Sequence, residues 1–186
     1  MRNGIRNCCL VLFGLIGFQT ANAQNVEIFL CINNGQFGDP SNSASDADCI
    51  DVLGWSWGGE FGGQFSDPTQ TSFDDLSLTK WTDNSSNYLM SKVTNAAISS
   101  LPNFQLRVRE GCGVPECVGP LLYQLTAPAG SIVSSVATGS SGLADRMTEN
   151  VTFNMPSSEW CTAVLDDNDD PTGPLTCGDN VLPSPP

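Results

Sequence analysis

Apolar and polar residues alternate with a period of two in short segments along most of this chain. The clearest case is residues 104–109, where Phe104, Leu106 and Val108 fall on one side and polar residues on the other. Residues i and i+2 of a strand share a face, so this alternation is typical of half-buried strands. Strands are predicted at residues 26–32, 50–58, 71–81, 104–109, 121–126, 132–138 and 148–155, with a further one continuing toward residue 164. Turn-rich segments separate them, which predicts a small, mostly antiparallel β-barrel or sandwich of about seven or more strands.

Residues 83–97 follow a different period and predict the one helix, flanking the sheet. Asp83, Asn84 and Ser85 offer side-chain oxygens that can cap its free N–H groups. An apolar stripe then recurs at i, i+1, i+4, i+7 and i+8, formed by Leu89, Met90, Val93, Ala96 and Ala97. Such a stripe is expected to cover one side or end of the sheet.

Residues 50–58 contain two of the four tryptophans and form the most unusual predicted strand. Strict alternation puts Leu53, Trp55 and Trp57 on one bulky face and small, weakly polar side chains on the other. A strand with no clearly wet face is packed on both sides. One face is expected to meet the protomer's own core. The other meets a helix, a second sheet or another subunit; an aromatic ligand site is the alternative.

Residues 71–81 also alternate, and they predict a single strand. Leu76, Leu78 and Lys80 fall on one face, together with Asp74. The other face carries Phe73, Asp75, Ser77, Thr79 and Trp81.

The N-terminus has the pattern of a secretory signal peptide. Arg2 and Arg6 precede or flank the start of an apolar run at residues 8–18, and Ala21-Asn22-Ala23 matches an A-x-A cleavage site. The run is too short to span a bilayer, and an uncleaved N-terminal anchor is the alternative. We therefore expect a signal peptide at 1–23, one β-barrel domain at 24–164 and an acidic, Pro-rich tail at 165–186. The mature protein is expected to be secreted or periplasmic.

Cleavage would leave five basic and 20 acidic residues, a net charge of −15. A surface of this sign repels nucleic-acid phosphates and anionic lipid headgroups. Nucleic acid and membrane are therefore excluded as primary partners.

Six cysteines follow the predicted cleavage site: Cys31, Cys49, Cys112, Cys117, Cys161 and Cys177. An even number in an exported chain predicts three disulfides, for which fifteen pairings exist. Nearest-neighbour pairing (31–49, 112–117 and 161–177) closes local loops rich in turn residues and is the pairing we favour. A zinc site is a poor alternative because the chain has no histidine and no paired C-x-x-C spacing.

Catalytic motifs are missing from the sequence. Without histidine there is no Ser-His or Cys-His pair, and neither a G-x-S-x-G elbow nor a phosphate-binding glycine loop occurs. Asp74 and Asp75 are adjacent, so in a strand they point to opposite faces and do not form a carboxylate pair. We expect a protein that is not an enzyme and that has no cofactor.

One acidic run, at residues 166–170, is a candidate calcium site. Asp166, Asn168 and Asp170 occupy positions 1, 3 and 5 of a calcium-loop pattern, but Pro171 and Cys177 stand where that pattern requires Gly and Glu. An EF-hand is excluded. The two remaining interpretations are a weak, extracellular-type calcium site and a solvated acidic loop.

Three segments together resemble a known family. They are IDVLGWSWG (50–58), DLSLTKWTDNSSNYLM (75–90) and IVSSVATGSSGLADRMTENVTFN (132–154). In this order and spacing they are similar to the haemolysin-coregulated protein family, Hcp, of bacterial type VI secretion. The resemblance implies a small β-barrel with one helix on its flank. It also implies six-membered rings with a wide central pore, which stack into a tube and carry or chaperone secreted effectors without being catalytic.

The chain departs from that family in two respects. Hcp tube proteins assemble in the cytoplasm without a Sec signal and do not need disulfides, whereas this chain has a predicted signal peptide and six mature cysteines. We therefore expect an exported Hcp-like structural protein that forms homo-hexamers, with secreted effector cargo carried in the ring. The alternative is a monomeric secreted binding module, with the loops at 33–48 and 58–70 as its partner site.

Overall fold

The computed structural model describes residues 25–33, 46, 49–61, 71–95, 100–111, 118–140, 146–166 and 170–181. Its elements are β1 (Val26–Ile32), β2 (Ile50–Ser56), β3 (Gly59–Phe61), β4 (Thr71–Phe73), β5 (Leu76–Trp81), α1 (Ser85–Thr94), β6 (Phe104–Glu110), β7 (Leu121–Ala127), β8 (Ile132–Gly139), β9 (Thr148–Asn154), β10 (Ser157–Thr162) and β11 (Thr176–Val181).

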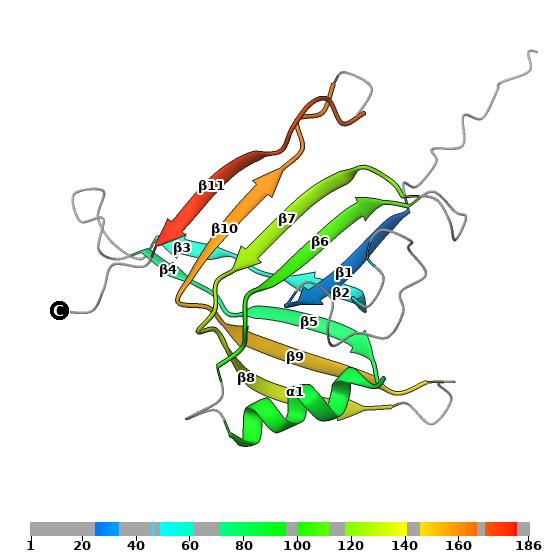
Figure 1. Ribbon diagram of the computed structural model, residues 1–186, viewed down its shortest axis with the longest axis vertical. Coiled ribbons are helices and arrows are strands. Elements are labelled where there is room, and N and C mark those ends of the chain that lie inside the picture. Colours follow the sequence, from blue (N-terminus) through cyan, green and yellow to red (C-terminus); the bar gives the residue numbers. More distant parts are fainter. Residues whose placement is uncertain are drawn as a thin grey trace, which may run out of the picture.

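Nine of the strands form one antiparallel sheet in the order β11-β10-β7-β6-β1-β2-β5-β9-β8, and β3 pairs with β4. Figure 1 shows this sheet strongly twisted, with α1 beside β8 and β9. The predicted class, antiparallel β with one flanking helix, is confirmed. In the described part of the chain no pairing joins β8 to β11, so these strands are the two edges of an open sheet and not neighbours in a closed barrel.

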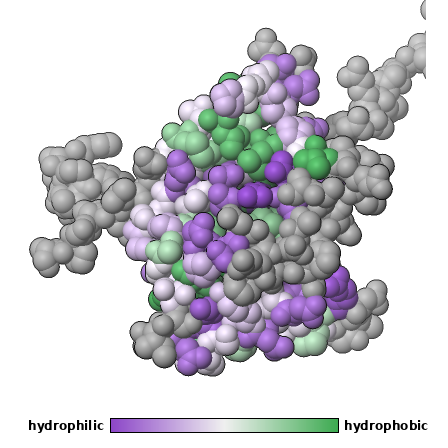
Figure 2. Space-filling model, in the orientation of Figure 1, coloured by the Kyte–Doolittle hydropathy of each residue, from purple (hydrophilic) through white to green (hydrophobic). Residues whose placement is uncertain are grey.

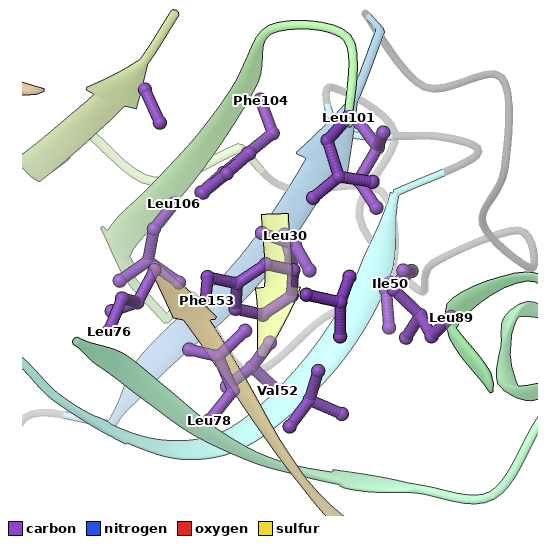
Figure 3. Close-up of a cluster of buried hydrophobic side chains, with 14 of the residues drawn as sticks. Leu30, Ile50, Val52, Leu76, Leu78, Leu89, Leu101, Phe104, Leu106 and Phe153 are labelled. Carbon is purple, nitrogen blue, oxygen red and sulfur yellow. The ribbon is translucent and has the colours of Figure 1, made fainter. Parts of the chain in front are cut away.

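The inner face of this curved sheet carries the main hydrophobic core. Alternate residues of β1, β2, β5, β6, β7, β8 and β9 point into it, and Leu89 of α1 closes one side (Figure 3). The rings of Phe104 and Phe153 meet at a centroid distance of 5.1 Å. Each fully buried aliphatic or aromatic side chain contributes about 1.5–3 kcal/mol relative to an exposed one. The period-two pattern therefore both forms the strands and supplies the core.

A β-bulge in β2 makes the prediction of strict alternation there wrong. Val52 pairs with Lys80, whereas Gly54 pairs with Thr79, so Leu53 is an extra residue in the strand. Leu53 is consequently 46% exposed. Trp55 and Trp57 pack against the main core and do not share a face with Leu53.

Three further boundaries differ from the sequence prediction. The chain between Phe73 and Leu76 leaves the strand, so residues 71–81 form β4 and β5 instead of one strand. The helix is Ser85–Thr94, and Met90 of the predicted apolar stripe is 41% exposed. Residues 176–181, expected in a tail, form β11 against β10. The sequence did not predict this strand, because Gly, Asp and Pro residues lie nearby. It forms by pairing with the edge of β10.

Some predictions concern residues outside the described part of the chain. These are the signal peptide at 1–23, the 112–117 disulfide, and most of the loops at 33–48 and 58–70. Among the described residues no helix has the length and apolarity needed to cross a bilayer.

Candidate functional site

The aromatic residues of the β2 segment contact aromatic residues of distant strands across the curved sheet. Trp55 stacks on Tyr123 of β7 with centroids 4.9 Å apart, although β1 and β6 separate β2 from β7 in the sheet order. Trp57 lies 5.8 Å from Trp160 of β10 and 6.0 Å from Phe73 of β4. Contacts between strands that are not neighbours require the sheet to curl back on itself. The Trp pair is therefore part of the protomer's inner face, where other aromatic rings cover it.

Burial of this aromatic group has an electrostatic consequence. Desolvation raises the pKa of the Tyr123 hydroxyl from 10.0 to about 12, so this phenol remains neutral through the physiological range.

The opposite face of β2, β5 and β9 carries uncharged side chains around Gly54. A shallow depression of about 430 Å³ lies over these strands, and its lining is Gly54, Trp55, Ser56, Ser77, Leu78, Thr79, Asn150 and Thr152. The hydroxyl of Thr79 donates to Asn150 Oδ1 at 2.8 Å, and a side chain added at Gly54 would meet no atom within 4 Å. Small polar side chains that satisfy one another leave a surface suited to close approach by another surface.

A charged cluster lies on the core face of the sheet, at the start of α1. Lys80 has no exposed side-chain surface, and its Nζ lies 2.9 Å from Asp83 Oδ1 and 3.2 Å from Glu149 Oε2. The same Nζ donates to the carbonyl of Trp81 at 2.7 Å. Ser86 Oγ donates to Glu149 Oε2 at 2.8 Å. We call Lys80, Asp83 and Glu149 the lysine cluster; it joins β5, β9 and the helix.

The lysine cluster also contacts the first residue of α1, although the N-cap residue Asn84 makes no side-chain cap hydrogen bond. Asp83 Oδ1 accepts the backbone N–H of Ser85 at 2.8 Å, as well as the Ser85 hydroxyl. The carboxylate thus satisfies a helix N-terminal donor while it neutralises Lys80. Because the amine and Glu149 are buried, this cluster presents no accessible reacting group and its role is structural.

A second charged cluster lies on the other face of the sheet, over β6. Asp46 is buried, and its Oδ1 and Oδ2 accept hydrogen bonds from Arg107 Nη1 at 2.5 Å and Arg109 Nε at 2.6 Å. Gln105 Oε1 accepts two further bonds from Arg107, and Gly119 O accepts one from Arg109. We call Asp46, Arg107 and Arg109 the arginine cluster. It fixes one point of the β1–β2 connection to the sheet.

The pKa of Asp46 results from two opposing effects. Burial alone would raise it, but the hydrogen bonds and positive charges of Arg107 and Arg109 outweigh burial and hold the pKa below its usual value of 3.8. The carboxylate is therefore ionised over a wider pH range than an ordinary aspartate.

Two of the predicted disulfides are present, Cys31–Cys49 and Cys161–Cys177. Cys161 and Cys177 are directly opposite in the β10–β11 pair. Cys31, Cys49 and Phe29 form a small second hydrophobic cluster, on the face of β1 that does not point into the main core. One bridge therefore holds the base of the β1–β2 connection and the other holds β11.

The proposed calcium ligands are only partly described. The backbone N–H of Asp170 donates to Asp166 Oδ1 at 3.0 Å, and the N–H of Asp166 donates to the carbonyl of Asp170 at 2.9 Å. Asn168 lies outside the described residues, so calcium binding stays a prediction. Among the described residues, the two other groups that could hold a metal are Cys31–Asp46–Cys49 and Glu159–Cys161–Cys177, and in both the cysteines are joined in disulfides.

The sequence indicated only part of these clusters. Alternation placed Arg107 and Arg109 on the outer face of their strand and put Lys80 on one face with Leu76 and Leu78, without predicting that this face is the buried one. Their partners were not predicted, because Glu149 and Asp46 are distant in sequence: 69 residues from Lys80 and 61 from Arg107.

The geometry thus defines a class: a small β protein built on an open, curved antiparallel sheet, with two disulfides and two buried charged clusters among its described residues. The chain belongs to the Hcp family of type VI secretion system effectors, whose family model matches residues 29–161. It is 34% identical over 134 residues to Protein hcp1 of Pseudomonas aeruginosa, an alignment covering 69% of this chain and 78% of that protein.

Solved structures share the fold. A structure of a type six secretion system protein superposes with a TM-score of 0.70 at 21% identity, covering 85% of this chain and 96% of that one. Hcp1 from Salmonella typhimurium gives a TM-score of 0.65 at 18% identity, covering 84% and 95%. A type VI secretion system effector from Yersinia pestis gives 0.61 at 19% identity, covering 83% and 98%.

Proposed function

We propose that this protein is an exported structural member of the Hcp family, which assembles as homo-hexameric rings and acts without enzymatic activity. The rings stack and enclose effector cargo. Sec export delivers the chain, after removal of residues 1–23, to a secreted or periplasmic location.

The observation that carries the ring proposal is that the open sheet ends in two different strands, β8 and β11. Joining one edge of a protomer to the unlike edge of the next is a heterologous contact, and heterologous contacts repeated around a rotation axis close into rings. Exposed edges are otherwise a liability, since their free N–H and C=O groups invite pairing. The depression over β2, β5 and β9, which is lined by uncharged side chains, supplies further surface for the contact.

Two features support export. Disulfides persist in oxidising compartments and are rare in the cytoplasm, and this chain forms two among its described residues. The signal-peptide pattern of residues 1–23 is consistent with the same route.

The test is the absolute mass of the mature, oxidised protein, residues 24–186, by light scattering after size exclusion. Six protomers are expected, with ring-shaped particles in electron micrographs. Ala137→Lys places a charge on the β8 edge and is expected to reduce the mass to that of smaller species. Val26→Lys adds the same charge at an exposed position of β1, a strand inside the sheet order, and is expected to leave the mass unchanged. A wild-type mass of one protomer at low and at high salt alike would refute the ring.

One observation favours the alternative of a monomeric secreted binding module. The connection between β1 and β2 is anchored by both the Cys31–Cys49 bridge and the arginine cluster, as a displayed recognition loop would be. In this case residues 33–48 and 58–70 carry the partner site. Replacing either loop would then abolish partner binding while the unfolding transition of the sheet is retained.

A further inference from the structure

The five basic residues that follow the predicted cleavage site all lie in the described part of the chain. Three of them form salt bridges within the lysine and arginine clusters. Lys80 is shared by Asp83 and Glu149, and Arg107 and Arg109 share Asp46. Three positive and three negative charges thus cancel inside the protomer. Only Lys92 and Arg146 are left to oppose the remaining 17 of the 20 acidic residues.

These two basic side chains also have partners within their own protomer, and the partners are neutral. Lys92 Nζ donates to the carbonyl of Ser100 at 3.3 Å and lies 5.3 Å from the centroid of the Tyr88 ring. Arg146 lies over the Trp81 ring at 5.1 Å. Among the described residues, Asp74, Glu159 and Asp170 are exposed, so a neighbouring copy meets carboxylates with few cations to pair them. Figure 2 shows one side of this surface, where hydrophilic residues predominate around α1.

The electrostatic cost of bringing such protomers together depends on salt. Like charges on approaching surfaces repel over the Debye length, which is about 30 Å at 0.01 M ionic strength, about 8 Å at 0.15 M and about 3 Å at 1 M. At low salt each protomer feels most of the charge of its neighbours, whereas at high salt only carboxylates at the contact itself still interact. Short-range pairing of sheet edges is largely independent of salt, so screening decides the balance.

We infer that self-association of this protein is gated by ionic strength: protomers separate in dilute salt and assemble when their net negative charge is screened. The inference rests on the proposed ring and adds the condition under which the ring forms. An exported chain would meet that condition on passing into a medium of higher ionic strength.

The first experiment measures the mass of the mature, oxidised protein by light scattering across a sodium chloride series, from about 0.01 M to about 1 M. We expect small species at the low end, six protomers at the high end and a midpoint between them. Six protomers at every salt concentration would overturn the gating and leave the ring standing. One protomer at every concentration would overturn both.

A matched pair of variants separates charge screening from other salt effects. Asp74 follows β4, Glu110 ends β6 and Glu159 is exposed in β10. None of the three takes part in the four salt bridges of the described residues. The triple variant Asp74→Asn, Glu110→Gln and Glu159→Gln is expected to assemble at a lower salt concentration than the wild type. The charge-conserving triple Asp74→Glu, Glu110→Asp and Glu159→Asp is expected to keep the wild-type midpoint. Equal midpoints for all three proteins would overturn the inference.

The identity of the cation provides the last control. Calcium chloride and magnesium chloride at equal concentration screen alike, so both are expected to shift the midpoint equally. Assembly driven by calcium alone would point to a specific calcium site, such as the predicted one at Asp166, and would overturn screening as the cause.

Discussion

The lysine cluster and the arginine cluster both neutralise buried charge by pairing side chains of opposite sign, and they lie on opposite faces of one sheet. The lysine cluster has one cation for two carboxylates and is buried in the core face beside α1. The arginine cluster has one carboxylate for two cations and lies beneath the β1–β2 connection. The side chains of Arg107 and Arg109 are 23% and 15% exposed, whereas that of Lys80 is 0% exposed. The comparison teaches that the first cluster belongs to the folding of the domain and the second to the attachment of a peripheral segment.

The largest expected effect is from breaking the lysine cluster. Lys80→Met leaves Asp83 and Glu149 buried without their cation, and removal of one partner from a buried pair costs about 3–5 kcal/mol. Urea unfolding is expected to show this loss, with weakened circular dichroism from α1. Lys92→Met, which removes an exposed amine of the same helix, is expected to change stability by less than about 0.5 kcal/mol. Similar losses for both variants would contradict a special role for Lys80.

The next largest effect concerns the bridge between β10 and β11. Cys161→Ser with Cys177→Ser removes a cross-link with a sequence separation of 16. The chain-entropy model assigns about 3 kcal/mol to a loop of this size. We expect a lower unfolding midpoint, together with faster amide exchange in β11, which among the described strands pairs only with β10. Unchanged exchange in β11 would show that backbone pairing alone holds this strand.

A smaller effect is expected from the arginine cluster. Asp46→Asn removes hydrogen bonds between charged groups and is expected to cost about 2 kcal/mol at neutral pH. The loss should leave the main core intact, so near-ultraviolet circular dichroism of the Trp55 and Trp57 region is expected to stay that of the wild type. A collapse of that signal would make this cluster part of the core.

The same variant tests pH dependence. Because the folded-state pKa of Asp46 is held below 3.8, its ionised carboxylate stabilises the folded state at every pH above the unfolded-state pKa. That contribution is lost as the pH falls through the lowered folded-state pKa. The difference in unfolding free energy between wild type and Asp46→Asn should therefore be constant from about pH 5 upward and shrink in more acidic solution. A difference that grows on acidification would contradict the sign of the shift.

The smallest effect concerns the two faces of β2. Leu53 sits at the bulge and is 46% exposed, whereas Val52 is only 7% exposed and points into the core. Leu53→Ala is expected to change stability by less than about 0.5 kcal/mol, and Val52→Ala to cost more although valine is the smaller side chain. Urea unfolding of the two variants in parallel makes the comparison, and the reverse order would contradict the bulge.

Most of the strands could be predicted because their signal is local. The alternation of Phe104, Leu106 and Val108 needs no knowledge of the rest of the chain, and all three are buried as expected. The helix was found by its period, but its ends and the exposure of Met90 depend on how α1 lies against β8. β11 was missed because its residues carry no alternation of their own and pair only with a strand that is already in place.

The candidate sites were less predictable, since each joins residues that are far apart in the chain. Nothing near Lys80 indicates that Glu149 will be its partner, and nothing near Arg107 indicates Asp46. The two disulfides were easier, because nearest neighbours close small loops, as Cys31–Cys49 and Cys161–Cys177 do.

Local periodicity, composition and contiguous signature segments were enough to predict the class of fold, the alternating faces of most strands, the acidic charge and the resemblance to the Hcp family. Three features became known only from the folded chain: the phase of β2 beyond Leu53, the curling that brings Trp55 onto Tyr123, and the partners of the buried charges. The physical reason is that these features are set by strand register and by the cost of burying an unpaired charge, both of which depend on residues brought together only when the sheet forms.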